Sequence, residues 1–309
     1  MGLVQRCALN ATSEVNQCAV AETAPMGAGG GGRAGEAVYL LGPFALRGIR
    51  NSFYTPNQLA GAVTAPPRAL DPPALTGVAP MLEQLKQQVC EANQKLAAGL
   101  AQPPWGTVSG IDRASRQMVI RPAGDLGDRL NPDDLVVVGL DDGAVIEGRS
   151  RPSVETLTHL VLYRAFAGIG GVVRSPSLYA TAWAQAGRDL PALGTSHADY
   201  FRGAVPCTRL QTPHEIRSDY EGSTGQVIVE RFRRLEPLHF PGVLVACHGP
   251  YSWGESVAQA LEHALVLEHL ARLGSETLRL NSGAGPLPRE LMEKRFQRKQ
   301  ARRPLSGPN

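Results

Sequence analysis

The sequence predicts an α/β fold of three layers, in which helices cover both faces of a central mixed, mostly antiparallel sheet. Apolar residues recur at helical spacing in some segments and form short β-branched runs in others, without the strict alternation of parallel βαβ units. Asp141-Asp142-Gly143 separates two short apolar runs, and a tight turn of this composition joins antiparallel strands. Together these observations favour a sheet enclosed between two layers of helices.

Residues 1–80 differ in composition from the rest of the chain and are predicted to form a disordered N-terminal extension, with the folded domain at residues 81–309. The run from Gly27 to Gly32 is nearly all glycine, and it lacks the Lys-Ser/Thr pair that follows a phosphate-binding glycine loop. Paired prolines interrupt the sequence further on. The extension is either a targeting segment or an upstream addition to a reading frame that begins at Met81.

The folded part begins with an amphipathic helix from Met81 onward, in which Leu82 and Val89 belong to an apolar face at helical spacing. Ser153 is a candidate N-cap for a second helix, which runs to about Phe166. Between these two helices, apolar and β-branched runs predict four strands, at residues 105–109, 117–121, 134–140 and 144–148.

Similar signals predict the elements that follow. Thr212-Pro213-His214-Glu215 has the composition of a capping box with proline at the first helical position. Gly274 is expected to end a long helix in a left-handed cap. The predicted strands lie at residues 170–173 and 225–232, and the predicted helices at 178–186, 255–273 and 288–300.

The stretch from Phe240 to Gly254 presents a candidate functional group at the end of a strand. Val243 to Val245 is an apolar run that predicts a buried strand, and Cys247-His248-Gly249-Pro250 follows it as a turn. An imidazole at a strand end combines rigid support with access to solvent. His248 is therefore a candidate functional residue, the alternative being a histidine that only hydrogen-bonds the turn.

Composition and charge argue against several classes of protein. The net charge of +3 is too small to predict nucleic-acid binding, and the basic residues gather near the C-terminus, as on a solvated helix face. No stretch approaches the ~18 apolar residues that a membrane span requires. The cysteine count of 5 is odd and includes no C-x-x-C pair, which predicts reduced thiols in a cytoplasmic protein.

Long strings in the folded part coincide with one family. They include MLEQLKQQV, WGTVSGIDR, SHADYFRGAVPCTR and HGPYSWG. Residues 81 to about 300 resemble the L-ribulose-5-phosphate 4-epimerases of the class II aldolase/adducin superfamily. The resemblance implies a homotetramer with sites between subunits, a zinc ion as cofactor, and a sugar phosphate of pentose and arabinose metabolism as substrate. It also implies a retro-aldol cleavage and recombination that invert C4, with a Lewis acid to stabilise the enediolate.

The resemblance assigns the metal site to four positions of this chain. Glu155 falls on the acidic ligand, and His248 falls on one of three histidine ligands. Arg174 and Pro176 fall on the other two histidines, and neither can ligate a cation, because arginine stays protonated and proline has no side-chain donor. One carboxylate and one imidazole are fewer ligands than a catalytic zinc centre uses.

The resemblance also assigns proton transfer and substrate binding. Asp199 matches the catalytic aspartate of the family, whereas the position of the catalytic tyrosine is Phe296, which has no hydroxyl. Two other imidazoles are candidate substitute ligands. His159 is interpreted as an outward or core helix residue; His197 is the better candidate, but the family carries it in addition to its own metal histidines, which argues against the substitution. The substrate-binding positions are Gly106, Thr107, Arg121, Ala123, Gly124, Ser153 and Val154.

Two functional hypotheses follow from these assignments. The first is a metal-dependent epimerase or aldolase that acts on a ketose phosphate. The second is a non-catalytic, adducin-like or degenerate member of the superfamily that serves as a binding or scaffold subunit. The second hypothesis exists because the substitutions gather at the metal, proton-transfer and phosphate positions, while the strands, helices and turns match well.

Overall fold

The computed structural model describes residues 78–99, 106–124 and 129–301. The chain divides into two units, Met1–Arg68 and Ala69–Asn309, and all described residues belong to the second unit. Residues 1–77 of the predicted N-terminal extension lie outside the described residues, so their predicted disorder stays a prediction. The first helix begins at Val78, slightly before the start expected at Met81.

The seven strands of the described part form one sheet in the order β4-β3-β2-β1-β5-β7-β6. Their bounds are β1 (Thr107–Asp112), β2 (Gln117–Ile120), β3 (Val136–Gly139), β4 (Val145–Glu147), β5 (Gly171–Arg174), β6 (Gly242–Val245) and β7 (Gly249–Gly254). Each pairing of neighbouring strands is antiparallel, and β3 pairs with β4 across the predicted Asp-Asp-Gly turn. Among the described residues, an isolated parallel bridge joins Cys207 to Leu244. The predicted mostly antiparallel sheet is confirmed.

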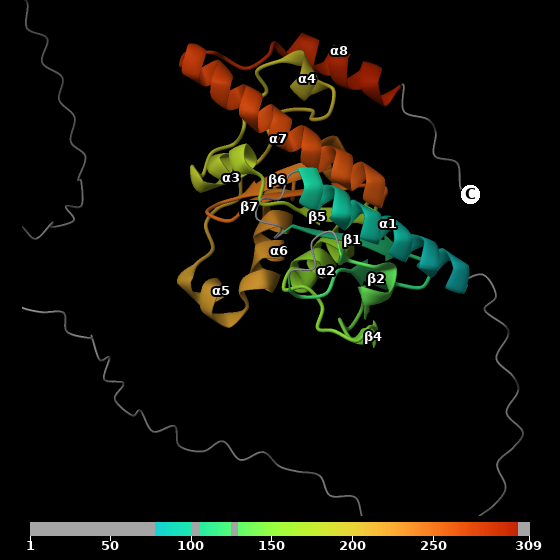
Figure 1. Cartoon of the computed structure of the whole chain (residues 1–309). Helices are drawn as coiled ribbons and strands as arrows, with labels where there is room; N and C mark the ends of the chain where they lie inside the picture. Colours follow the sequence, from blue (N-terminus) through green and yellow to red (C-terminus); the bar gives the residue numbers. More distant parts are fainter. Residues whose placement is uncertain (1–77, 100–105, 125–128, 302–309) are drawn as a thin grey trace, which may run out of the picture. The chain divides into compact units, whose positions relative to one another are not determined.

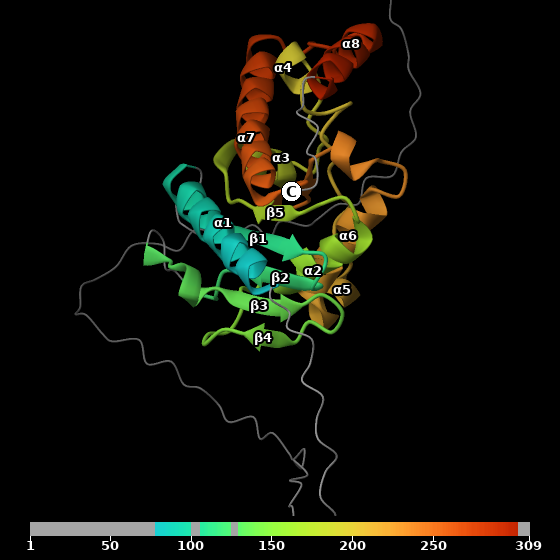
Figure 2. The ribbon, with the colours of Figure 1, turned by 90° about the vertical axis from the view of Figure 1, so that its right-hand side faces the viewer.

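Helices cover both faces of this sheet, as Figures 1 and 2 show. Their bounds are α1 (Val78–Gly99), α2 (Thr156–Ala165), α3 (Leu178–Gln185), α4 (Thr195–Ala198), α5 (Pro213–Ser218), α6 (Tyr220–Arg231), α7 (Val257–Leu280) and α8 (Arg289–Gln300), with short 3₁₀ turns at η2 (Pro132–Asp134) and η3 (Pro237–His239). In Figure 2, α1 and α7 lie on one side of the strands, and α2 and α6 lie on the other. Within the described part, no helix is both long and apolar enough to cross a membrane.

Two buried apolar clusters, one on each face, hold the layers together. Successive side chains of a strand point to opposite faces, so neighbouring strands contribute alternate residues to each cluster. Val108, Val119, Val137 and Val173 pack against α1 and α7. Ile120, Val172, Tyr251 and Trp253 pack on the face covered by α2 and α6. The three-layer architecture therefore follows from the alternation of apolar residues in the strands.

The predicted strand at residues 225–232 is wrong, because this segment belongs to helix α6. The Asp219 side chain accepts a hydrogen bond from the Gly222 amide and caps the helix. The β-branched run favoured a strand, but Val227 and Ile228 are buried on one helix face together with Thr224. A Cβ atom added at Gly225 would lie 2.6 Å from the Val161 Cβ atom, so this glycine permits close packing of α6 on α2.

Two predicted helix ends also differ from the structure. Helix α7 continues past Gly274 to Leu280, so this glycine does not cap the helix. It leaves room for Leu190 instead, because an added Cβ atom would lie 2.7 Å from that side chain. Ser153 lies just before the helix it was predicted to cap, because α2 begins at Thr156 with Glu155 at the N-cap position. The Ser153 hydroxyl accepts a hydrogen bond from the Glu155 amide instead.

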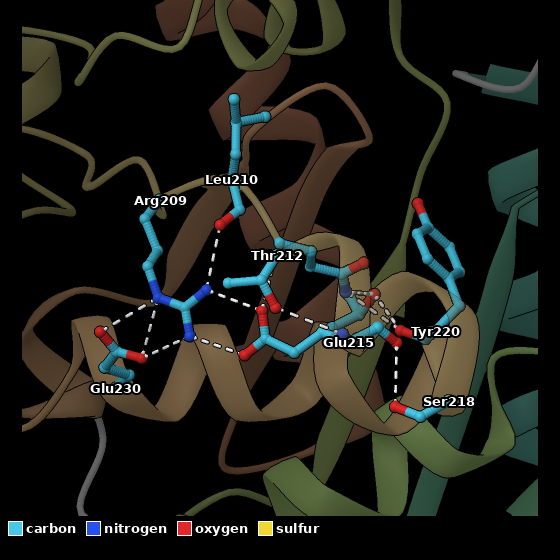
Figure 3. Close-up of polar contacts among 9 residues, drawn as sticks. Arg209, Leu210, Thr212, Glu215, Ser218, Tyr220 and Glu230 are labelled. Carbon is cyan, nitrogen blue, oxygen red and sulfur yellow. Dashed lines mark hydrogen bonds and ion pairs between the residues drawn. The ribbon is translucent and has the colours of Figure 1, made fainter.

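The predicted capping box at the start of α5 is confirmed, and Figure 3 shows it within a larger polar cluster. The Glu215 amide donates to the Thr212 hydroxyl at 3.2 Å, and the Thr212 amide donates to the Glu215 carboxylate at 2.7 Å. Arg209 donates to the carboxylates of both Glu215 and Glu230. This guanidinium lowers the pKa of Glu215 to about 2. The cluster joins the start of α5 to α6, whose first residue is Tyr220.

Candidate functional site

Three neighbouring strands place one side chain each in a row across the sheet. In the strand register, Thr107 of β1 faces Arg174 of β5, and Arg174 faces Tyr251 of β7. The Thr107 hydroxyl lies 3.2 Å from the hydroxyl of Ser153, a residue that lies just before α2. The row therefore lies on the face that α2 covers, beside the N-terminus of that helix.

Glu155, at the N-cap position of α2, lies over this row and contacts two of its members. The Tyr251 hydroxyl donates to Glu155 Oε2 at 2.6 Å, and Arg174 Nε lies 3.7 Å from Glu155 Oε1. Burial raises the pKa of Glu155, while the Tyr251 hydrogen bond and the Arg174 charge oppose that rise. The carboxylate is thus buried, with a donor on one oxygen and a cation beside the other.

His248 reaches the same group from the turn between β6 and β7, as the strand-end interpretation expected. Its Nε2 atom lies 3.1 Å from the Tyr251 hydroxyl and 3.9 Å from Glu155 Oε1. The backbone turns sharply here, with Cys247 at a φ of 60° and Gly249 at 148°. Burial, helped by the Arg174 charge, lowers the pKa of His248 to about 4, so the imidazole is neutral at pH 7.

A chain of hydrogen bonds runs from Glu155 outward through His248. Because the Tyr251 hydroxyl donates its hydrogen bond to Glu155, the Tyr251 oxygen accepts one from His248 Nε2–H, so the neutral imidazole carries its proton on Nε2. His248 Nδ1 then accepts from the Tyr220 hydroxyl at 3.0 Å. Figure 3 shows the Tyr220 ring directed away from the Arg209 cluster, as this contact requires. The chain orders four side chains, from the buried carboxylate of Glu155 through Tyr251 and His248 to the exposed Tyr220.

The structure brings together three of the four positions that the resemblance assigned to a metal, and it places Pro176 close by. Arg174 Nε and His248 Nε2 lie 3.7 and 3.9 Å from the same Glu155 oxygen, Oε1. The Ser175 amide donates to the Pro250 carbonyl at 3.4 Å, which holds the segment containing Pro176 beside the His248 turn. The convergence of these positions in space is therefore as expected.

The side chains at this point do not fit a zinc centre. Glu155 Oε2 and His248 Nε2 both bond the Tyr251 hydroxyl, and Glu155 Oε1 faces the Arg174 guanidinium. Among residues 78–99, 106–124 and 129–301, no cluster of three or more histidine, cysteine, aspartate or glutamate side chains could hold a cation. A catalytic zinc ion takes about three protein ligands and an open position. Two donors beside a guanidinium fall short of that set.

Most of the predicted substrate-binding positions gather beside Glu155. Arg121 donates to the carbonyls of Gly106 at 2.8 Å and Gly124 at 2.6 Å, and its own carbonyl accepts from the Ser153 amide. Ser153 also contacts Thr107. Arg121 therefore binds the backbone of the loops that carry the other positions. The Arg121 guanidinium shapes these loops.

The last two predicted substrate-binding positions contribute less. The Ala123 amide donates to the Arg151 carbonyl at 2.8 Å, which ties the two loops together. Val154 is 68% exposed, whereas the adjacent Glu155 is buried. Both positions border the loop pair, and neither offers a polar side chain.

Asp199 lies at a different place from Glu155 and His248. It ends α4, and its carboxylate accepts two hydrogen bonds from Arg295 of α8, at 2.9 and 2.5 Å. Phe296 packs against His239, with ring centroids 5.2 Å apart. Within the described part of the chain, no hydrogen bond or ion pair joins Asp199 to the Glu155 group. The predicted catalytic residue Asp199 is thus bound by Arg295, which directly precedes Phe296 at the position of the family's tyrosine.

The two histidines considered as substitute ligands, His159 and His197, have structural contacts. His159 Nδ1 lies 2.7 Å from the Ser109 hydroxyl, and burial lowers the pKa of this histidine to about 3. His197 Nε2 lies 2.8 Å from the Gly203 carbonyl, and burial lowers its pKa to about 4. The interpretation of His159 as a helix residue in the core agrees with this position. His197, the candidate substitute ligand, instead bonds the backbone of its own loop.

Sequence reasoning missed Tyr251 and Tyr220. Tyr251 follows His248-Gly249-Pro250 directly, but its role depends on the register that places it opposite Arg174. Tyr220 starts the helix that was predicted as a strand from residue 225 onward. The only signal in the sequence was a tyrosine next to a strand-end histidine.

Comparisons with known proteins identify the family of this chain. The family model described as "Class II Aldolase and Adducin N-terminal domain" matches residues 87–274. The L-ribulose-5-phosphate 4-epimerases UlaF of Salmonella paratyphi A and Salmonella typhi are each 47% identical over 229 residues, which is 74% of this chain and 97% of theirs.

Solved structures support the fold. An L-fuculose 1-phosphate aldolase superposes with a TM-score of 0.60 at 23% identity, covering 70% of this chain and 96% of that chain. An aldolase II superfamily protein from Pseudomonas syringae gives 0.59 at 17% identity, covering 73% and 88%. From the matched family model and the extent of identity to the epimerases, we conclude that this chain belongs to the class II aldolase and adducin family.

Proposed function

We propose that this chain is an L-ribulose-5-phosphate 4-epimerase-like protein that takes a ketopentose phosphate as its ligand. The observation that carries the proposal is the 47% identity to proteins named for that activity, which spans 97% of their length. The closeness of the Thr107 and Ser153 hydroxyls, with Ser153 bonded to the Glu155 amide, supports it, because hydroxyl groups can donate to a phosphate. The non-catalytic scaffold hypothesis is kept as one outcome of the test below.

Members of this family are generally metal-dependent, and the resemblance implies zinc. Zinc would supply Lewis-acid stabilisation of an enediolate when bound. Glu155 and His248 are the candidate ligands in this chain, and the bonds of Tyr251 to both compete with a cation. We therefore assign no step to the metal. Thr107 and Ser153 are proposed to orient the phosphate, and Asp199 is proposed to transfer a proton once it is released from Arg295.

The proposal extends to assembly, pathway and location. We propose a homotetramer, which the resemblance implies, with sites between subunits. We also propose a role in pentose or arabinose metabolism and a cytoplasmic location. The free thiols of Cys90, Cys207 and Cys247 support a reducing compartment.

Turnover of L-ribulose 5-phosphate tests the proposed function directly. The full chain is incubated with this ketose phosphate, with and without added zinc, and formation of D-xylulose 5-phosphate is followed. Measurable epimerisation that Ser153→Ala weakens mainly through KM supports the proposal. Absence of turnover under both conditions, with a folded protein, favours the scaffold hypothesis.

A variant with the family residues restored separates a damaged site from a wrong assignment. We expect Arg174→His, Pro176→His and Phe296→Tyr together to bind zinc and to epimerise faster than the parent chain. Arg188→Gln, a change of an exposed arginine that stacks on Trp183, is the matched control. A restored variant that binds zinc without any gain in activity would contradict the assignment of these positions.

A further inference from the structure

The guanidinium of Arg174 is the unusual feature of this site. Its Nε atom is buried and has no hydrogen-bond acceptor among the described residues. Its one ionic partner in the described part is Glu155 Oε1, and the 3.7 Å that separates the two is longer than a hydrogen bond. Glu155 therefore balances the charge of Arg174 without accepting a hydrogen bond from Nε. A buried N–H group without an acceptor is costly unless a ligand supplies one.

The surroundings of Arg174 fit a small oxyanion. Only 15% of its side-chain surface and 16% of that of His248 remain exposed, so bulk water is largely excluded from both. In the strand row, the neighbour of Arg174 on one side is Thr107, whose hydroxyl contacts that of Ser153. Charge-assisted bonds from a fork of N–H groups are the strong, directional way to hold a carboxylate or phosphate.

We propose that Arg174 itself binds an oxyanion of the ligand, at the position where the resemblance places a metal-binding histidine, so that binding requires no divalent cation. The ligand chemistry is a phosphate or a carboxylate on a small polyhydroxy molecule. This choice of ligand class rests on the proposed function. In this arrangement the fixed charge of Arg174 takes the place of a bound cation. Arg174 would then supply to the anion the positive charge that zinc supplies in the metal-dependent relatives.

Binding of simple anions to the full-length protein in the presence of EDTA tests this proposal. The probes are inorganic phosphate, glycolate and 2-phosphoglycolate, which carries both groups, and calorimetry measures the dissociation constants. We expect 2-phosphoglycolate to bind in EDTA and Arg174→Gln to weaken it by about 10- to 100-fold, as the loss of one charge-assisted bond would. Loss of glycolate binding assigns Arg174 to a carboxylate, and loss of phosphate binding assigns it to a phosphate.

Two further variants keep the test decisive if Arg174→Gln unfolds. Arg174→Lys keeps the charge and loses the fork, so intermediate affinity is expected. Arg174→Gln combined with Glu155→Gln avoids a buried unpaired carboxylate and should fold and bind weakly. Arg188→Gln should bind as the parent does. Anion binding that appears only with added zinc, or that Arg174→Gln leaves unchanged, overturns the proposal.

These outcomes are separable from the proposed function. Zinc-dependent epimerisation with no anion binding in EDTA contradicts the role of Arg174 and leaves the epimerase function standing. Anion binding in EDTA that depends on Arg174, without epimerisation, supports the role of Arg174 and contradicts the enzyme function.

Discussion

The hydroxyl of Tyr251 is shared by the two side chains that the family resemblance assigns to a metal. It donates to Glu155 and accepts from His248, and it is fully buried between them. Burial, together with the nearby charge and hydrogen bond of Glu155, raises the pKa of Tyr251 well above its usual value, so the hydroxyl keeps its proton. One phenol therefore sets both the tautomer of the imidazole and the position of the carboxylate.

Removal of this hydroxyl gives a first prediction. Tyr251→Phe leaves the buried Glu155 carboxylate without its donor, so we expect a loss of about 1–3 kcal/mol in the free energy of unfolding. Urea unfolding followed by circular dichroism measures the loss. Tyr200→Phe removes a tyrosine hydroxyl that bonds Glu262 near the surface and serves as the control. Equal effects of the two substitutions would show that the Glu155 contact is not special.

The buried histidines give a second prediction, for the dependence of stability on pH. Burial lowers the pKa of His197 from 6.5 to about 4 and that of His159 to about 3. Between these values and 6.5 the unfolded chain binds protons that the folded chain does not. The stabilisation is thus complete above pH 6.5 and is lost as the pH falls through about 4.

Urea midpoints measured from pH 7 down to pH 4 check this dependence. We expect a steady fall below about pH 6.5, and a shallower fall in His197→Gln, which removes one of the titrating groups. His214→Gln, at an exposed histidine, is the control for the substitution itself. A midpoint that stays constant from pH 7 to about pH 4.5 would rule out the shifted histidines as the cause.

At the scale of elements, the close approach of α2 and α6 rests on one glycine. A Cβ atom at Gly225 would lie 2.6 Å from the Val161 Cβ atom, which is too close for the two helices to keep their separation. We expect Gly225→Ala to lower the free energy of unfolding by about 1–3 kcal/mol, as over-packing does. Gly99→Ala is the control, because the described residue that its added Cβ atom meets is Leu265, at an ordinary contact distance of 3.9 Å. Urea unfolding of both variants compares them, and a neutral Gly225→Ala would contradict the tight packing.

The sequence predicted most elements because their signals were local. The Thr212 capping box and the Asp-Asp-Gly turn carry their structure in a few adjacent residues, and both are confirmed. The β-branched run around Val227 predicts a strand, but the segment is helical. Its burial comes from packing on α2, which is distant in the sequence. Gly274 was read as a cap although it makes room for Leu190. Contacts between distant segments decided both errors.

The site was predictable in part for the same reason. The resemblance placed Glu155 and His248 together, and the structure brings them to 3.9 Å. The unpartnered Nε of Arg174 and the shared hydroxyl of Tyr251 depend on strand register. Register joins distant segments, so no single segment of the sequence reveals it. The pairing of Asp199 with Arg295 joins residues that lie 96 positions apart, and local spacing gives no hint of it.

At the scale of the whole molecule, exposed apolar side chains adjoin the site. Val154 is 68% exposed beside Glu155, and Leu178 is 74% exposed shortly after Arg174. Apolar side chains left in water next to a site are what subunit contacts around that site would cover. They support the proposed homotetramer with sites between subunits.

Light scattering after gel filtration tests the assembly. We expect a mass close to four times the 32.9 kDa of one chain. Leu178→Asp should lower that mass toward the dimer or monomer, because burial of a new charge in an interface is costly. Leu280→Asp is the control, since that side chain is 85% exposed at the far end of α7. A monomer in the parent protein would contradict the proposal.

Cys247, which has a left-handed backbone, lies in the turn beside His248 and offers a thiol for chemical labelling. This thiol is exposed, whereas Cys90 and Cys207 are buried, and burial raises the pKa of both. An environment-sensitive maleimide attached there, with Cys7 and Cys18 replaced by serine, would report through its fluorescence on ligand binding near His248. The same strained turn that presents the imidazole thus offers a place for an optical sensor.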